Sequence, residues 1–151
     1  MRTASADNVI VRQCSAEEIV PLRHVVLRAG LPIDAARFPG DDSADAVHFA
    51  AERYGEIVGC CTLHQEPYHG EPAWRLRGMA VAENQQGGGI GRALLAEVDE
   101  YVRQHPHSNL LWANARLIAI KFYERLGWKI VSELFDIPTA GPHHVMIKRL
   151  G

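Results

Sequence analysis

The stretch QGGGIG, residues 86–91, is the part of the sequence that decides the fold. The apolar run 74–81 precedes it and predicts a buried strand. After it, apolar side chains recur at helical spacing and predict an amphipathic helix to about Gln104, ahead of Pro106. Glycines at such a turn leave backbone N–H groups uncovered, and the start of a helix adds unpaired donors and a partial positive charge. The stretch therefore predicts an anion-binding loop, most often one that binds phosphate.

Two common phosphate-binding motifs do not fit this loop. A Walker A loop ends in Gly-Lys-Ser/Thr, whereas Gly91 is followed by Arg-Ala. The dinucleotide fingerprint G-x-G-x-x-G fails because its last glycine would fall on Arg92 or Leu94, depending on where it starts. The pattern that fits is Gln/Arg-x-x-Gly-x-Gly, matched by Gln86, Gly89 and Gly91.

A second motif, FYERLGW at residues 122–128, lies downstream of the loop. Together the two motifs resemble the pyrophosphate loop and the Phe-Tyr-x-x-x-Gly-Phe signature of the GCN5-related N-acetyltransferase (GNAT) family, with Trp128 in place of the last Phe. The resemblance covers roughly residues 77–150, about half of the chain. It implies one N-acetyltransferase domain over residues 1–151 and acetyl-CoA (coenzyme A) as co-substrate.

Length and composition agree with one globular enzyme domain. The chain has 151 residues, of which 47% are apolar and 23% charged. A net charge of −2 favours neither nucleic acid nor an anionic membrane, and no apolar run is long enough to span a bilayer. The first nine residues lack the apolar core of a signal peptide. We therefore expect no nucleic-acid partner and no membrane association.

The cysteines and histidines indicate neither disulfides nor a metal site. Cys14, Cys60 and Cys61 are odd in number and form no C-x-x-C pattern, so reduced thiols in a cytoplasmic protein are expected. Cys60 and Cys61 are neighbours in a predicted strand and should point to opposite faces. The eight histidines contain no H-x-x-x-H pair, so we expect no metal.

The order of predicted elements indicates an α/β (α+β) domain with a mixed, mostly antiparallel central sheet flanked by helices. Ser15 should cap the first helix, and Gly127 should close the last one. The predicted strands are 9–13, 46–53, 56–64, 74–81, 110–113, 129–136 and 144–148; the predicted helices are 15–29, 90–104 and 116–126; the segment 31–45 is a loop or short helix.

Gly78 interrupts the alternation of the strand before the loop. Trp74 and Leu76 are apolar in one phase, and Met79 and Val81 are apolar in the opposite phase. A glycine at such a slip predicts a β-bulge that splays the neighbouring strands. The family resemblance implies that the pantetheine arm of the coenzyme lies in this gap and pairs with backbone there.

The resemblance also implies which residues contact the coenzyme. The candidates are Met79, Ala80, Val81, Gln86, Gly87, Gly88, Gly89, Ile90, Gly91, Arg92, Asn114, Phe122 and Tyr123. Many family members have Asn seven residues before the tyrosine, where this chain has Arg116. Asn114 lies two residues earlier and is either a contact of the pantetheine arm or a helix N-cap.

Acetyl transfer to an amine needs a neutral nucleophile and an acid for the leaving thiolate. The matching tyrosine of the family is the general acid, which assigns this role to Tyr123. Several members use a Glu on the strand before the loop as base, but residues 74–82 contain no carboxylate. The candidate bases are His143, Glu133 or a water relay. Arg75, Arg77 and Arg116 are candidate contacts for an acceptor carboxylate, although arginines are often solvated, and Arg116 could instead face the coenzyme.

Two functions are consistent with these residues. The first is an acetyl-CoA-dependent N-acetyltransferase that moves an acetyl group to a primary amine of a small molecule or peptide. The second is a non-catalytic acyl-CoA sensor on the same fold, because fold alone does not prove activity. Tyr123 favours the first, and the missing carboxylate favours the second. Either function is compatible with a homodimer.

Overall fold

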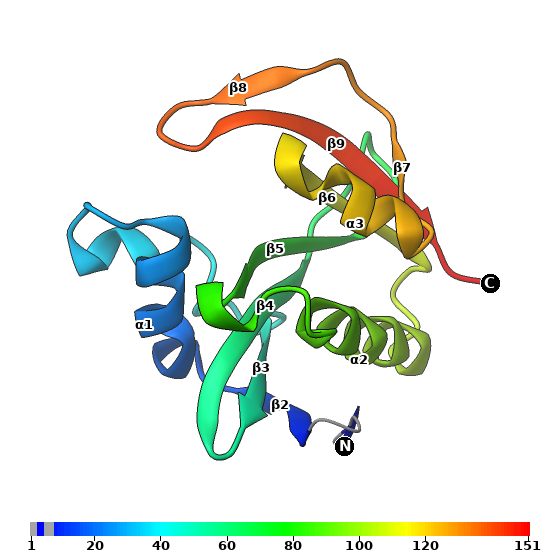
Figure 1. The fold of residues 1–151 in the computed structure, drawn as a ribbon. Helices are drawn as coiled ribbons and strands as arrows, with labels where there is room; N and C mark the ends of the chain where they lie inside the picture. Colours follow the sequence, from blue (N-terminus) through cyan, green and yellow to red (C-terminus); the bar gives the residue numbers. More distant parts are fainter. Residues whose placement is uncertain (1–2, 5–7) are drawn as a thin grey trace.

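The computed structural model describes residues 3–4 and 8–151 (Figure 1). Its described strands form one sheet in the order β1-β2-β3-β4-β5-β6-β9-β7, and β8 also pairs with β9. All pairings among these strands are antiparallel except that between β5 and β6. The strands are β1 (Thr3–Ala4), β2 (Val9–Cys14), β3 (Val47–Arg53), β4 (Glu56–Gln65), β5 (Trp74–Val81), β6 (Leu110–Arg116), β7 (Lys129–Ile130), β8 (Phe135–Ile137) and β9 (Gly141–Arg149).

Within the described residues, three α-helices cover the sheet: α1 (Ala16–Leu27), α2 (Ile90–Gln104) and α3 (Ile120–Arg125). The same part of the chain has three short 3₁₀ helices that connect elements: η1 (Ile33–Ala36), η2 (Glu83–Gln85) and η3 (Leu117–Ala119). Figure 1 shows α1 on one side of the sheet and α2 on the other. Among the described helices, none is both long and apolar enough to cross a membrane. The mixed, mostly antiparallel sheet with flanking helices confirms the predicted fold class.

The strands divide their buried side chains between the two faces of the sheet. Cys60 packs with Ile19 of α1, whereas Cys61 belongs to the larger core that contains Leu94 of α2. This arrangement confirms that the two adjacent cysteines point to opposite faces, as the alternation of a strand requires. All three cysteines are free.

The first helix begins where its sequence predicts. Ser15 accepts a hydrogen bond from the Glu18 backbone N–H, and the Glu18 carboxylate accepts one from the Ser15 N–H. This capping box satisfies two donors that a bare helix start leaves unpaired. The helix ends at Leu27, two residues earlier than predicted.

Gly78 forms the predicted bulge in β5. Cys60 pairs with Ala80, but Thr62 pairs with Arg77, so β5 carries one extra residue at this point. Gly78 has a φ of +66°, which favours glycine. The pairing between β5 and β6 is limited to Trp74 with Leu111 and Arg75 with Trp112. Both strands continue beyond these pairs, so they splay apart after Arg75, as predicted.

Three predicted elements in the C-terminal half have different bounds in the structure. The helix predicted over 116–126 is shorter, because β6 extends through Arg116, which pairs with His143 of β9. The chain then passes through η3 before α3 begins at Ile120. The strand predicted over 129–136 is two short strands, and the last strand begins at Gly141 rather than His144. Pairing with neighbouring strands outweighed the local sequence pattern here.

Candidate active site

A groove runs along the start of α2 and the end of β5. We call it the coenzyme groove, and its volume is about 520 Å³. It is lined by Val26, Leu27, Met79, Ala80, Val81, Gln85, Gln86, Gly87, Gly89, Ile90, Gly91, Arg92, Arg116, Ile118, Ala119, Phe122, Arg125 and Leu126. The groove therefore brings together the residues of both sequence motifs and the edge of β5 that β6 leaves unpaired.

The start of α2 leaves its backbone donors free toward this groove. Gly89 is the N-cap in a left-handed conformation, with φ at +84°, and it has no side chain to accept a hydrogen bond from the first turn. The first intrahelical bond closes from the Ala93 N–H to the Gly89 carbonyl, so the N–H groups of residues 90–92 have no partner within the helix. A Cβ at Gly87 or Gly89 would meet nothing within 4 Å. These residues fit the phosphates of a coenzyme, as an anion can approach this backbone closely.

Two residues of the loop motif have a structural reason for their identity. Gln86 donates from Nε2 to the Val81 carbonyl oxygen at 3.2 Å, which ties the loop to the end of β5. A Cβ at Gly91 would lie 2.8 Å from Cζ of Phe122. The glycine therefore lets the ring of the second motif pack against α2. The two motifs are in direct contact, which the sequence alone did not show.

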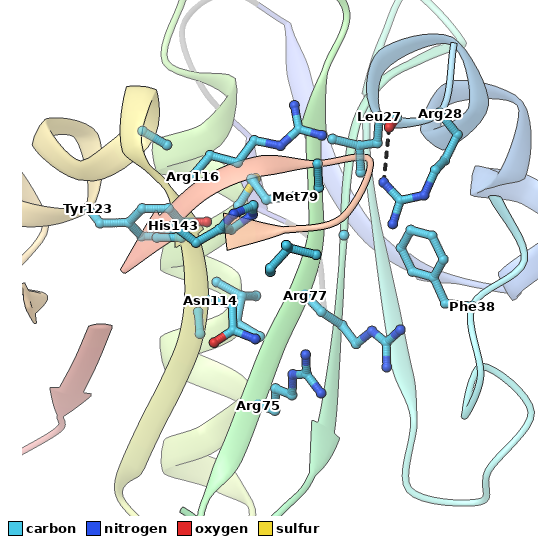
Figure 2. Close-up of a pocket in the computed structure, with 17 residues that line it drawn as sticks. Leu27, Arg28, Phe38, Arg75, Arg77, Met79, Asn114, Arg116, Tyr123 and His143 are labelled. Atoms are coloured by element: carbon cyan, nitrogen blue, oxygen red, sulfur yellow. Dashed lines mark hydrogen bonds between the residues drawn. The ribbon is translucent and has the colours of Figure 1, made fainter. Parts of the chain in front are cut away.

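A second cavity opens on the gap between β5 and β6, with a volume of about 200 Å³ (Figure 2). We call it the arginine cleft. It is lined by Leu27, Arg28, Phe38, Arg75, Leu76, Arg77, Gly78, Met79, Ala113, Asn114, Ala115, Arg116, Ala119, Tyr123, Ile137, Ala140 and His143. Leu27, Met79, Arg116 and Ala119 line both cavities. The coenzyme groove and the arginine cleft therefore meet at these four residues.

Tyr123 reaches this cleft from α3. Its side chain is 5% exposed and lies edge-on to the rings of Phe122 and Trp128. Burial, with a further contribution from nearby Cys61, raises the pKa of its hydroxyl above the ordinary value. The hydroxyl therefore stays protonated at neutral pH. No described residue forms a hydrogen bond with it, so its proton is available to a bound molecule.

His143 lies in β9, not in the preceding loop as predicted, and it is 4% exposed. Its Nδ1 lies 2.7 Å from the Gly141 carbonyl oxygen. A carbonyl only accepts, so Nδ1 carries the hydrogen and Nε2 of the neutral ring has a free lone pair. Nε2 has no hydrogen-bond partner among the described residues. His143 and Tyr123 both line the arginine cleft (Figure 2). A protonated hydroxyl and a ring nitrogen with a free lone pair therefore line the same cavity.

The structure also places the remaining candidates, Glu133, Asn114 and Gly88. Glu133 is exposed, belongs to the segment between β7 and β8, and does not line the arginine cleft. Asn114 lies within β6 opposite Val145 and lines the arginine cleft rather than the coenzyme groove. Asn114 is also not a helix cap, because the N-cap of α3 is Ala119. Gly88, predicted to contact the coenzyme, does not line the groove.

Four arginines line the cleft, and no carboxylate does. Arg75 and Arg77 share one face of β5, and Arg116 lies opposite His143 in the ladder between β6 and β9. Arg28 follows α1, and Phe38 lies beyond η1. The sequence did not single out Arg28 or Phe38, because only the tertiary fold brings their segments to the sheet. Within the described residues, no group of three or more His, Cys, Asp or Glu is placed to hold a metal ion.

Comparison with known proteins agrees with this arrangement. Residues 19–128 match the Acetyltransferase (GNAT) family. The chain is 30% identical over 143 residues to YitI of Bacillus subtilis (strain 168), described as an uncharacterized N-acetyltransferase, and the match covers 93% of this chain and 95% of YitI.

Solved structures share the fold. Escherichia coli ElaA superposes with a TM-score of 0.77 at 17% identity, covering 92% of this chain and 99% of ElaA. An aminoglycoside 6'-N-acetyltransferase complexed with coenzyme A superposes with a TM-score of 0.72 at 16% identity, covering 92% of this chain and 96% of that protein. Since the family match spans more than half of the chain, this protein belongs to the GNAT family of acetyltransferases.

Proposed function

We propose that this protein is an acetyl-CoA-dependent N-acetyltransferase that acts on a primary amine of a small molecule or peptide. The observation that carries the proposal is the junction of the two cavities. The coenzyme groove, with the free N–H groups of α2, runs into a cleft that holds a protonated tyrosine and a histidine with a free ring nitrogen. A sensor would need the groove alone.

The coenzyme groove fits a molecule that has phosphates at one end and an extended arm. Residues 89–92 would hold the pyrophosphate with backbone N–H groups, and the unpaired edge of β5 at Met79 to Val81 would pair with the pantetheine arm. Bound acetyl-CoA supplies an acetyl thioester, whose carbon exchanges its bond to sulfur for a bond to the amine nitrogen. Held by the loop and the strand edge, the coenzyme would direct its thioester toward the junction with the arginine cleft.

The side chains of the cleft have complementary tasks in this reaction. A primary alkylammonium has a pKa of about 10.4, so at neutral pH it must lose a proton before attack. Nε2 of His143 can accept that proton directly or through a water. The Tyr123 hydroxyl can donate its proton to the departing sulfur, because burial keeps it protonated. Between the ammonium and the amide the nitrogen loses two protons; the departing sulfur gains one, and the other is released to solvent.

The test measures the release of free CoA from acetyl-CoA in the presence of a panel of amines. The acetylated product is identified and quantified by mass spectrometry. The proposal predicts release that depends on the amine and equals the amount of N-acetylated product. If CoA binds by calorimetry but no amine accelerates its release, the protein is the non-catalytic acyl-CoA sensor instead.

A further inference from the structure

The arginine cleft contains positive charge that the protein does not neutralise. Arg75 lies 3.3 Å from Glu66, and its guanidinium packs 4.9 Å from the Trp112 ring centre. The other three arginines, Arg28, Arg77 and Arg116, form no ion pair with any described residue. No carboxylate lines the cleft, so the charged side chains that face a bound molecule there are arginines, which favour an anion over a cation.

Arg28 and Arg77 converge on one aromatic ring from two different elements. Their guanidinium carbons lie 4.9 Å and 5.1 Å from the centre of the Phe38 ring. The guanidinium of Arg23 is closer, at 4.1 Å, but its charge is paired with Asp41. Figure 2 shows Arg28 beside Phe38 and Arg77 reaching from β5 toward the same ring. Two guanidinium groups that form no ion pair therefore lie against the ring of Phe38.

Each of these two side chains is held by a single neutral contact. Arg28 donates from one terminal nitrogen to the Leu27 carbonyl oxygen at 3.0 Å, and Arg77 donates to the Pro39 carbonyl oxygen at 3.1 Å. Because a guanidinium has five N–H donors, most of each fork remains free for a planar oxyanion. The contacts fix the side chains in place and so lower the entropy cost of binding such a group.

The electrostatic environment favours the arrival of an anion. Burial lowers the pKa of Arg28, and the neighbouring charges of Arg116 and Arg23 lower it further. Burial likewise lowers the pKa of Arg77; Arg75 and Arg23 add to the effect, and the more weakly acting Asp41 and Glu66 only partly oppose it. A bound oxyanion would relieve this repulsion in a partly dry site, where charge-assisted hydrogen bonds are stronger than in water.

We propose, on the basis of the function proposed above, that the acceptor is a small primary amine that carries an oxyanion, and that Arg28 and Arg77 bind this oxyanion beside Phe38. The amine of such an acceptor would extend from this end of the cleft toward His143, Tyr123 and the junction with the coenzyme groove. We choose a carboxylate as the oxyanion, because its planar geometry matches the guanidinium fork. Polyamines and other cationic acceptors are excluded by the charge of the cleft.

Matched acceptors test the proposal through kcat/KM for CoA release. Glycine, β-alanine and γ-aminobutyrate are each compared with the corresponding amide, with phosphoethanolamine as the phosphate arm and 1,3-diaminopropane as the cationic arm. We expect at least one acid to exceed its amide by about 100-fold or more, because the amide leaves the arginines unpaired. If phosphoethanolamine has a higher kcat/KM than the carboxylic acids, the oxyanion site is supported but its ligand is a phosphate and not a carboxylate.

Substitutions of Arg28 and Arg77 test whether these two residues cause the preference for the acid over its amide. Arg77→Gln and, from a different element, Arg28→Gln should each reduce the ratio of acid to amide at least tenfold. Arg103→Gln is the matched control, because Arg103 lies on α2 with its side chain 50% exposed, outside both cavities. It should leave the ratio unchanged.

The outcomes separate the two proposals. If amines are acetylated but amides or 1,3-diaminopropane react as well as the acids, the oxyanion site is wrong and the N-acetyltransferase function stands. The same conclusion follows if the acid preference survives in both arginine variants. If no amine accelerates CoA release, the N-acetyltransferase function itself is wrong.

Discussion

Tyr123 enters the arginine cleft from the face of the sheet opposite to Arg75 and Arg77. Its ring belongs to the core under α2 and α3, and it reaches the cleft because β5 and β6 are no longer paired there. The hydroxyl is therefore the polar tip of an otherwise apolar side chain. A residue that merely filled the core would have no reason to keep that hydroxyl without a hydrogen-bond partner.

Tyr123→Phe tests the role of this hydroxyl. The change keeps the ring and its contacts with Phe122 and Trp128, so the free energy of unfolding should be nearly unchanged. If the hydroxyl is the general acid, kcat should fall by about 100-fold or more, while the affinity for CoA measured by calorimetry stays the same. A normal kcat in this variant, under conditions in which chemistry limits the rate, would show that Tyr123 only packs in the core and is not the general acid.

His143 and Glu133 offer a matched comparison for the base. His143 is buried in the cleft, whereas Glu133 is exposed and lies outside it. We expect His143→Gln to lower kcat/KM, because the variant has no ring nitrogen to accept the proton of the amine. Glu133→Gln should keep the rate and the pH profile of the parent. The reverse result would make Glu133 the base, and two unaffected variants would leave deprotonation to water.

The start of α2 is the element that should recognise phosphate. Gly89→Asp would place a carboxylate where the pyrophosphate is expected and should abolish CoA binding by calorimetry. Gly89→Asn is the control, because asparagine tolerates the same φ of +84° and has nearly the same size without the charge. It should retain much more affinity than the aspartate variant. Equal affinity of both variants would show that charge at this helix start is irrelevant to the coenzyme.

The best-predicted elements are those with strong local signals. β5 and α2 have the predicted bounds, because a glycine-rich loop separates them and the glycine at 78 marks the bulge within the strand. The third helix was predicted too long, since Arg116 is drawn into β6 by its pairing with β9. No local pattern reveals such a pairing, because the partner strand lies 27 residues away at His143.

Some residues of the candidate site could be predicted from the sequence and others could not. The loop and Tyr123 could be predicted, because each belongs to a contiguous motif. The arginine cleft could not, because its residues come from α1, the segment after η1, β5, β6 and β9. Arg28 and Phe38 carried no signal in the sequence. His143 precedes the last predicted strand by one residue, and only the structure shows that it lies within β9 and lines the cleft. Convergence of this kind is a property of the whole molecule.

A buried network fixes the wall of the cleft that Phe38 provides. Arg23 of α1 is fully buried and forms two hydrogen bonds with the Asp41 carboxylate, at 2.7 Å and 3.1 Å. It also donates to the Thr62 hydroxyl of β4 at 2.7 Å, and Asp41 accepts from the Phe38 N–H at 3.0 Å. One ion pair therefore joins α1, the sheet and the segment that carries Phe38.

Asp41→Asn should destabilise the whole protein, because it leaves the Arg23 charge buried without a counter-ion. The expected loss in the free energy of unfolding at pH 7 is about 3–5 kcal/mol, measured by urea denaturation. A loss below 1 kcal/mol would show that water or another group compensates Arg23 and that the network does not hold the wall.

The same pair makes stability depend on acid pH. Burial alone would raise the pKa of Asp41, but the hydrogen bonds and charge of Arg23 outweigh it and lower the pKa below its ordinary value. The stabilisation is therefore present above the unfolded-state pKa of about 3.9 and is lost as the pH falls through the lower native value. The difference in stability between the parent and Asp41→Asn should narrow on acidification to about pH 3. A constant difference would contradict this linkage.

The central claim is that the coenzyme groove and the arginine cleft form one active site, joined at Leu27, Met79, Arg116 and Ala119. The most direct test is a crystal structure of the protein with CoA, in which the position of the CoA sulfur is measured relative to Tyr123 Oη. The account predicts the pyrophosphate on the N–H groups of residues 89–92 and the sulfur within hydrogen-bond reach of Tyr123 Oη, directly or through one water. A sulfur that lies away from the junction, with Tyr123 facing only protein, would contradict it.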